Sequence, residues 1–218
     1  MYKYFLFINF FCIYHIFLYS NFSVFADENL SESVCSIKNI EDFEKNSLSH
    51  KNLRIIGNEE NSPEVRMSRN VTAPIPNSTR SLLLRFFSTG NTFPVEIFFD
   101  KPLEIGEFVK EFTFHIYSSG NGSRVFFYLI DVKGEVHKIF ISNLTFQGWK
   151  AIRVGLDTKF EQNDLVLNHS SKVYFTGFLI EPREKILKNK EDLLAIDDIF
   201  VTIREKYKII KKLDQLIE

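Results

Sequence analysis

The chain has 218 residues, of which 44% are hydrophobic, and its 27 basic and 28 acidic residues give a formal net charge of −1. This composition is typical of one or two globular domains and excludes a chain that is disordered throughout. The balanced charge gives no electrostatic basis for binding nucleic acid, so no nucleic-acid partner is expected.

The first 26 residues have the pattern of an export signal. A single charged residue, Lys3, precedes an apolar run from Tyr4 to Leu18, and small residues stand at the −3 and −1 positions before a cleavage point after Ala26. We predict cleavage there, export to the periplasm and no membrane association of the mature chain. The alternative is an uncleaved anchor, although the apolar run is shorter than the roughly 20 residues of a spanning helix. Cleavage would remove Cys12 and leave Cys35 as the only cysteine.

Short apolar segments with β-type patterning follow the signal at regular intervals. A loop with two prolines is expected over Met67 to Thr79, and charged or polar excursions over 157–171 and 181–192. The expected strands outside the middle of the chain are Ile37 to Phe43, Leu53 to Ile56, Ser81 to Phe87, Val95 to Phe99, Val173 to Ile180 and Ala195 to Ile203.

The middle of the chain, Glu111 to Leu156, predicts four consecutive strands with short links. The first alternates apolar and polar residues, and the turn from Ser118 to Ser123 contains two glycines. The second, Val125 to Ile130, is apolar on both faces and is expected inside a sheet. A tight hairpin at Asp131 to Gly134 leads into the third strand, and Trp149 opens the fourth.

These elements predict an all-β fold, a jelly-roll-like antiparallel β-sandwich similar to carbohydrate-binding modules, with roughly eight to ten strands. The expected boundaries are a signal peptide over 1–26, the β-sandwich domain over 27–204 and a helical tail over 205–218. The tail has an amphipathic period, and it either caps the sandwich or docks on a neighbouring subunit. The first strand, with Ile40 to Glu44, and the last strand, with Ile196 to Ile199, resemble those of carbohydrate-binding jelly-roll modules. In these modules the two terminal strands pair, and an acidic group there can hold a structural calcium. Asp42, Glu44 and Asp197 are the candidates here, against the simpler reading that they face solvent.

The middle segment also resembles the spirochaete flagellar filament outer-layer (sheath) protein family, FlaA. The resemblance rests on Asp-x-x-Gly-x-x-His-Lys, with Asp131, Gly134 and His137, and on the later Gly148-Trp149 pair. It implies a structural protein of the periplasmic flagellum, assembled around the flagellin core with copies of itself or related sheath proteins. One loop, SSGNGSR, departs from the pattern of the family.

Enzyme motifs are absent from the sequence, and neither catalysis nor a cofactor is expected. The histidines have no metal-ligand spacing, although His115 and His137 fall on strands that could meet across a sheet. Glu96, Asp100, Asp131 and Glu135 are carboxylates with no pattern that pairs them in one cleft. Trp149 is expected in the core rather than exposed as a sugar platform.

Two hypotheses follow for the function. The first is a structural component of the flagellar filament outer layer. The alternative is an exported carbohydrate-binding-like module that recognises glycan or peptidoglycan, and exposed aromatic residues on the concave face together with calcium dependence would favour it.

Overall fold

The computed structural model describes residues 35–56, 63–86, 93–106, 108–156, 160–162, 172–182 and 192–204. Within these ranges the chain forms eleven strands and one short 3₁₀ helix. The elements are β1 (Cys35–Glu41), η1 (His50–Asn52), β2 (Leu53–Ile55), β3 (Glu64–Ser68), β4 (Ser81–Phe86), β5 (Val95–Ile105), β6 (Phe108–Ser119), β7 (Arg124–Ile130), β8 (Val136–Asn143), β9 (Gln147–Gly155), β10 (Val173–Glu181) and β11 (Asp192–Arg204).

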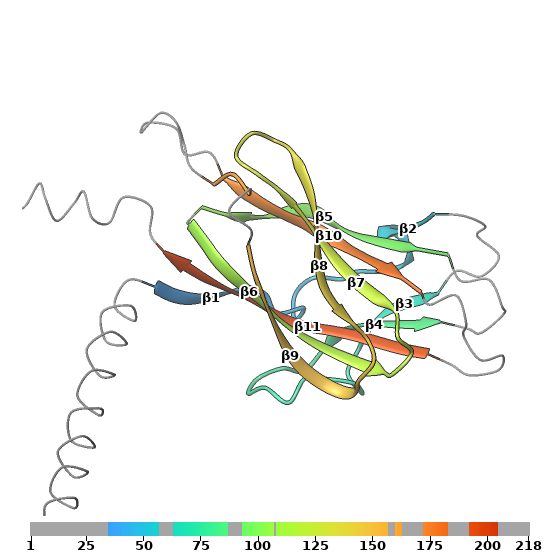
Figure 1. Ribbon diagram of the computed structural model, residues 1–218. Coiled ribbons are helices and arrows are strands. Elements are labelled where there is room, and N and C mark those ends of the chain that lie inside the picture. The colour runs from blue at the N-terminus through green and yellow to red at the C-terminus, as the bar shows by residue number, and fades with distance from the viewer. Residues whose placement is uncertain are drawn as a thin grey trace, which may run out of the picture. The chain divides into compact units, whose positions relative to one another are not determined.

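The strands form two sheets that pack face to face (Figure 1). The six-stranded sheet has the order β3-β4-β11-β6-β9, with β1 also paired to β11, and the five-stranded sheet has the order β2-β5-β10-β7-β8. Every neighbouring pair along these two orders is antiparallel. The predicted antiparallel β-sandwich is therefore confirmed, as is the pairing of the first and last strands.

The four predicted strands of the middle segment are present, but two of their links cross between the sheets. β7 and β8 form the predicted hairpin in the five-stranded sheet, whereas β6 and β9 pair with each other in the six-stranded sheet. β7 lies between β10 and β8, as its apolar character on both faces predicted.

Two elements differ from the sequence prediction. β3 was not predicted, because this short edge strand alternates the charged Glu64 and Arg66 with only two apolar residues. β5 continues past its predicted end at Phe99 to Ile105 and so includes Pro102. Proline is tolerated there because Pro102 lies in the irregular stretch of β5 between Phe98 and Leu103, which faces only Thr176 of β10.

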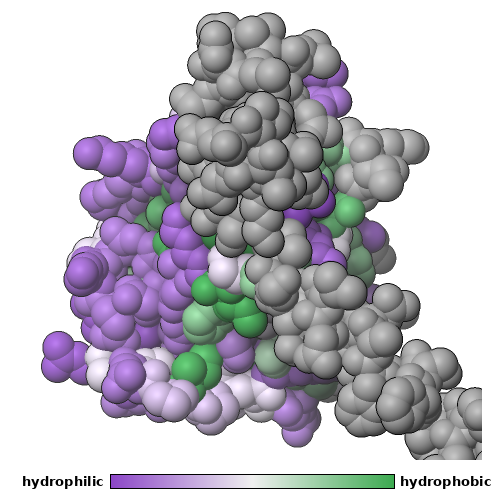
Figure 2. Space-filling model, turned by 90° about the vertical axis from the view of Figure 1, so that its left-hand side faces the viewer, coloured by the Kyte–Doolittle hydropathy of each residue, from purple (hydrophilic) through white to green (hydrophobic). Residues whose placement is uncertain are grey.

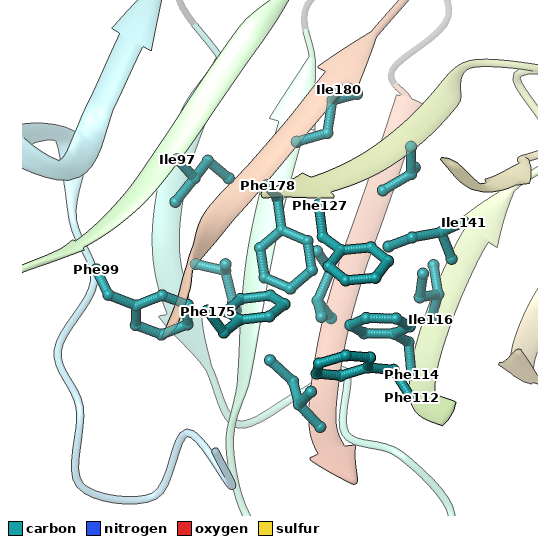
Figure 3. Packing of buried hydrophobic residues seen from close by; sticks show 14 of the residues in the cluster. Ile97, Phe99, Phe112, Phe114, Ile116, Phe127, Ile141, Phe175, Phe178 and Ile180 are labelled. Carbon is teal, nitrogen blue, oxygen red and sulfur yellow. The ribbon is translucent and has the colours of Figure 1, made fainter. Parts of the chain in front are cut away.

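The core between the sheets is rich in phenylalanine (Figure 3). Phe175 of β10 lies at its centre, and its ring centroid is 5.2 to 6.2 Å from those of five other phenylalanines. Its partners come from β5, β6, β7 and β10 and are Phe99, Phe112, Phe114, Phe127 and Phe178. Residues of both sheets therefore share one apolar core. Because this core occupies the inner faces, polar and functional groups are expected on the outer faces of the sheets.

The predicted signal peptide with its cleavage point after Ala26, and the predicted helix over 205–218, lie outside the described residues. Among the described residues, no helix has the length and apolar character needed to cross a bilayer. On the face drawn in Figure 2, hydrophilic side chains cover most of the described surface and hydrophobic ones gather in small patches.

Candidate functional site

The outer face of the five-stranded sheet carries a pocket of about 450 Å³. Its volume lies within the range of small-molecule sites, roughly 300 to 1,000 Å³. The apolar lining comes from Phe98, Phe99, Pro102, Ile130 and Val136, and the polar lining from Glu96, Tyr128 and Thr176. β5, β10, β7 and β8 supply these residues, so the pocket exists only when all four strands are paired.

An aromatic pair forms one wall of the pocket. Phe98 of β5 and Tyr128 of β7 are both register partners of Gly177 in the strand between them. Their rings stack with centroids 5.9 Å apart and planes inclined by 15°. Because Gly177 has no side chain, the two rings can approach each other across β10.

A buried carboxylate lies beside this pair. Glu96 is 8% exposed, and its Oε1 accepts a hydrogen bond of 2.7 Å from the Tyr128 hydroxyl. Its Oε2 is buried and accepts no hydrogen bond from a described residue. The guanidinium of Arg54 is 3.7 Å away from it, which is an ion-pair distance and too long for a hydrogen bond. Glu96 therefore presents an acceptor whose hydrogen-bonding capacity is not used within the described part of the chain.

Burial, together with the hydrogen bond to Glu96, raises the pKa of Tyr128 above the ordinary phenol value. The hydroxyl therefore stays protonated at neutral pH and keeps donating to the carboxylate. Its own oxygen lone pairs remain available to accept a hydrogen bond from a ligand.

More aromatic side chains lie on the same outer face, one row further along the strands. Phe126 of β7 and Phe140 of β8 meet edge to face at 5.4 Å between centroids, and Phe140 is 45% exposed. The ammonium group of Lys138 lies 4.7 Å from the Phe126 ring centroid. The face thus combines exposed ring surface with polar groups.

The residues of the FlaA-like motif fall in two separate places. Asp131 and His137 flank the β7–β8 turn, with Oδ2 and Nε2 2.8 Å apart, and Gly134 adopts a φ of +84° within the turn. Gly148, with a φ of +86°, and Trp149 lie in β9 of the other sheet. The motif residues therefore belong to one hairpin and to one strand of the other sheet, and they do not form one joint site.

The prediction for Trp149 is wrong, and a possibility that the sequence left open for His115 and His137 is not realised. Trp149 is only half-buried and packs edge to face on Tyr117, at 5.8 Å between centroids, on the outer face of the six-stranded sheet. It faces outward because its register partner Tyr117 alternates with the buried Ile116 and Ser118. His115 and His137 do not meet, because β6 and β8 belong to different sheets.

The acids considered for calcium are each engaged by protein groups. Glu44 accepts hydrogen bonds from the backbone N–H groups of Thr79 and Arg80, and Asp42 accepts one from the N–H of Glu44. Asp197 is fully buried, so the prediction that it faces solvent is wrong. Within the described ranges, these three acids do not gather their oxygens around one point.

Asp198 follows in β11 with a positive φ of 39°, and its Oδ1 accepts a 2.5 Å hydrogen bond from Asn39 of β1. Burial raises the pKa of this carboxyl above its ordinary value of 3.8. The folded protein therefore binds this proton more tightly than the unfolded chain does. The associated stability is present below pH 3.8 and is lost as the pH rises through the raised folded-state pKa.

We expect Asp198→Asn to raise the unfolding temperature at pH 7 and to leave it unchanged at a pH below 3.8. Asparagine keeps an oxygen for Asn39, tolerates positive φ and does not ionise. Thermal unfolding of both proteins followed by circular dichroism across this pH range measures the difference. A difference that is constant with pH would show that the charge of Asp198 has no part in it.

Sequence reasoning missed the pocket. Phe98, Tyr128 and Gly177 belong to three strands that are distant along the chain, and only their register brings them together. One signal was available: Gly177 interrupts an otherwise apolar strand, which indicates a bulge or a close backbone approach.

No protein-family model and no curated protein matches this chain. Among solved structures, it is similar to the carbohydrate-binding module TmCBM61 in complex with β-1,4-galactotriose, with 16% identity and a TM-score of 0.47, over 77% of this chain and 99% of the module. It is also similar to the family 11 carbohydrate-binding module from Clostridium thermocellum in complex with a mixed-linked tetrasaccharide, with 14% identity and a TM-score of 0.41, over 76% and 94% of the two chains. The sugars named are ligands of those modules, and the β-sandwich assignment of this chain rests on its own two sheets.

Proposed function

We propose that this protein is a non-catalytic glycan-binding module that holds a neutral oligosaccharide in the pocket on the outer face of the five-stranded sheet. The observation that carries the proposal is the stacked Phe98–Tyr128 pair beside the buried Glu96 oxygen that accepts no hydrogen bond. The periplasm is the compartment we propose for it, on the basis of the sequence signal.

The pocket offers what a sugar ring requires. One face of many pyranose rings is a patch of C–H groups, which packs on aromatic surface such as Tyr128, while the ring edge is a series of hydroxyl donors and acceptors. The Oε2 of Glu96 would accept from one hydroxyl, and the Tyr128 oxygen from another. The ion pair with Arg54 at 3.7 Å leaves Oε2 without a hydrogen bond, so a sugar hydroxyl that donates to this oxygen would add a favourable contact.

The same carboxylate determines the class of glycan. A second negative charge placed against the buried Glu96 carboxylate is repelled, since the Arg54 guanidinium at 3.7 Å is largely exposed and solvent screens its charge. We therefore propose neutral sugars rather than uronic acids or sulfated glycans as ligands.

A binding role fits the pocket better than glycoside hydrolysis does. Hydrolysis uses two carboxyl groups that flank the scissile bond. Glu96 is the single carboxylate among the described residues that line the pocket.

Tyr128→Ala is expected to weaken oligosaccharide binding by about tenfold or more, since loss of 1.4 kcal/mol of contact energy corresponds to a factor of ten. Tyr128→Phe keeps the ring and removes the hydroxyl, so it is expected to lose less. Isothermal titration calorimetry with neutral β-linked gluco-, galacto-, xylo- and manno-oligosaccharides, and with peptidoglycan fragments, measures the affinities.

Trp149→Ala is the matched control, because it removes an aromatic side chain of the outer face of the opposite sheet. It is expected to leave the affinity unchanged. If Trp149→Ala abolishes binding and Tyr128→Ala does not, the site lies on the six-stranded sheet and the proposed pocket is wrong. If wild-type protein binds none of the glycans, the proposed function itself fails.

The FlaA-like resemblance leaves a role in the outer layer of the periplasmic flagellar filament as a second proposal. One observation agrees with assembly: the edge strand β8 presents Val136, 66% exposed, and Phe140 on its outer face. Co-sedimentation with purified filaments, before and after a wash that strips outer layers, tests it. Protein that pellets with filaments and is released by the wash supports this role, and protein that stays in the soluble fraction excludes it.

A further inference from the structure

Three potential metal ligands meet at the β7–β8 hairpin. One ligand atom each from Asp131, Glu135 and His137 lies within 4.8 Å of the others. We propose that these side chains bind a divalent transition-metal ion of the zinc type. The proposal is independent of glycan binding.

Asp131 is held in position before any ion arrives. It is 3% exposed, and its Oδ1 accepts hydrogen bonds of 2.9 Å from the backbone N–H groups of both Lys133 and Glu135. The backbone of Asp131 closes the turn as well, since its carbonyl accepts from Gly134 and its N–H donates to the carbonyl of Glu135. One carboxylate oxygen is therefore fixed by the turn, and Oδ2 is directed at His137.

His137 and Glu135 complete the group. The Nε2 of His137 is 2.8 Å from Asp131 Oδ2, and its ring packs edge to face on Phe160 at 5.0 Å between centroids. Ligand atoms of a tetrahedral zinc ion with bonds of about 2.0 to 2.1 Å stand about 3.3 Å apart, so a small opening of this pair admits the ion. Glu135 is exposed, and its carboxylate has no hydrogen bond or ion pair with another described residue, so it is free to turn inward.

The donor set selects the kind of ion. One imidazole nitrogen with two carboxylate oxygens suits zinc and similar ions, whereas calcium prefers oxygen ligands only. Two carboxylates balance the charge of a divalent ion. Three protein ligands leave a fourth position for water, as in open zinc sites.

The ion would tie the end of β7 to the start of β8. Ile130 and Val136, which line the sugar pocket, directly precede Asp131 and His137. The two sites nevertheless lie on opposite faces, since Val136 and His137 are successive residues of one strand and point to opposite sides. Bound ion is therefore expected to stabilise the fold without entering the pocket.

Calorimetric titration of the full chain with ZnCl₂, together with thermal unfolding, tests the proposal. We expect saturable binding and an unfolding temperature that rises with zinc concentration, because an ion that binds only the folded state stabilises it. Glu135→Gln and His137→Ala are each expected to weaken zinc binding at least tenfold, and Glu135→Gln carries no folding risk because its side chain is exposed.

His115→Ala is the matched control, since it removes a histidine of the other sheet, and it is expected to bind zinc as wild type does. Cobalt provides a second readout: its visible absorption is expected to report nitrogen and oxygen ligation in wild type and to be lost in Glu135→Gln. The proposal is overturned if Glu135→Gln binds zinc as tightly as wild type does. It is also overturned if His115→Ala loses zinc binding while His137→Ala keeps it.

Discussion

Gly177→Ala is expected to destabilise the protein by about 4 kcal/mol or more, the range of exceptional single substitutions. A Cβ built on Gly177 would lie 2.0 Å from the backbone oxygen of Ile97 and 3.0 Å from the Cα of Phe98. Both atoms belong to the main chain of β5, so no side chain can move aside. The register of β10 shifts at this point against both β5 and β7, which brings the backbones into this close approach.

Urea unfolding monitored by circular dichroism measures the effect. Gly134→Ala is the matched control, because Gly134 has a φ of +84° but nothing within 4 Å of a built Cβ. It is expected to cost only about 1 kcal/mol, the backbone penalty of positive φ. Equal losses in the two variants would contradict the close approach at Gly177.

The function of Gly177→Ala distinguishes packing from binding. Because Phe98 and Tyr128 stack across Gly177, any rearrangement that accommodates the new methyl group separates the rings. The variant is therefore expected to lose glycan binding even at low temperature, where a folded fraction persists. Normal affinity of that folded fraction would show that the stack is not needed for the ligand.

Asp197→Ala is expected to cost about 3 to 5 kcal/mol of stability. The carboxylate of Asp197 accepts hydrogen bonds from the N–H of Ala73 at 2.9 Å, the Ser78 hydroxyl at 2.6 Å and the N–H of Asp198 at 2.9 Å. Each buried donor left without a partner costs about 1 to 3 kcal/mol. The Asp197 side chain therefore holds the loop that follows β3 in contact with strand β11.

Two further variants give the expected order of effects. Asp197→Asn keeps one oxygen but turns an NH₂ group toward donors, so it is expected to be destabilising, though less than Asp197→Ala. Asp42→Ala, which removes an exposed carboxylate with one local hydrogen bond to Glu44, is expected to cost no more than about 1 kcal/mol. Denaturant unfolding of all three measures the order, and an Asp197→Ala cost as small as that of Asp42→Ala would refute the role assigned to Asp197.

Much of the secondary structure was predictable because it follows local rules. Phe112, Phe114 and Ile116 alternate with polar residues, and a strand places alternate residues on opposite faces. The hairpin at Asp131 to Gly134 was predictable because Gly134 supplies the left-handed residue that the turn requires. β3 escaped prediction because its few apolar residues give a weak signal, and it is held in place by its pairing with β4.

The candidate site was not predictable from the sequence, because it depends on which strands pair and in which register. Alternation states that Phe98 and Glu96 share a face of β5, but it does not state which strand pairs with β5 or in which register. The same limit explains the error at Trp149, whose orientation depends on its partner Tyr117.

The sequence by itself therefore determined the all-β class, most strands and the hairpin with Asp131, Gly134 and His137, since these depend on neighbouring residues. The tertiary structure alone decided that β6 and β7 belong to different sheets, that Asp197 is buried and that Phe98 and Tyr128 meet across Gly177. These features depend on contacts between residues about 30 to 120 positions apart, as in the pair Asp197–Ala73, 124 positions apart. No local pattern encodes such contacts, because they follow from packing both sheets around one shared core.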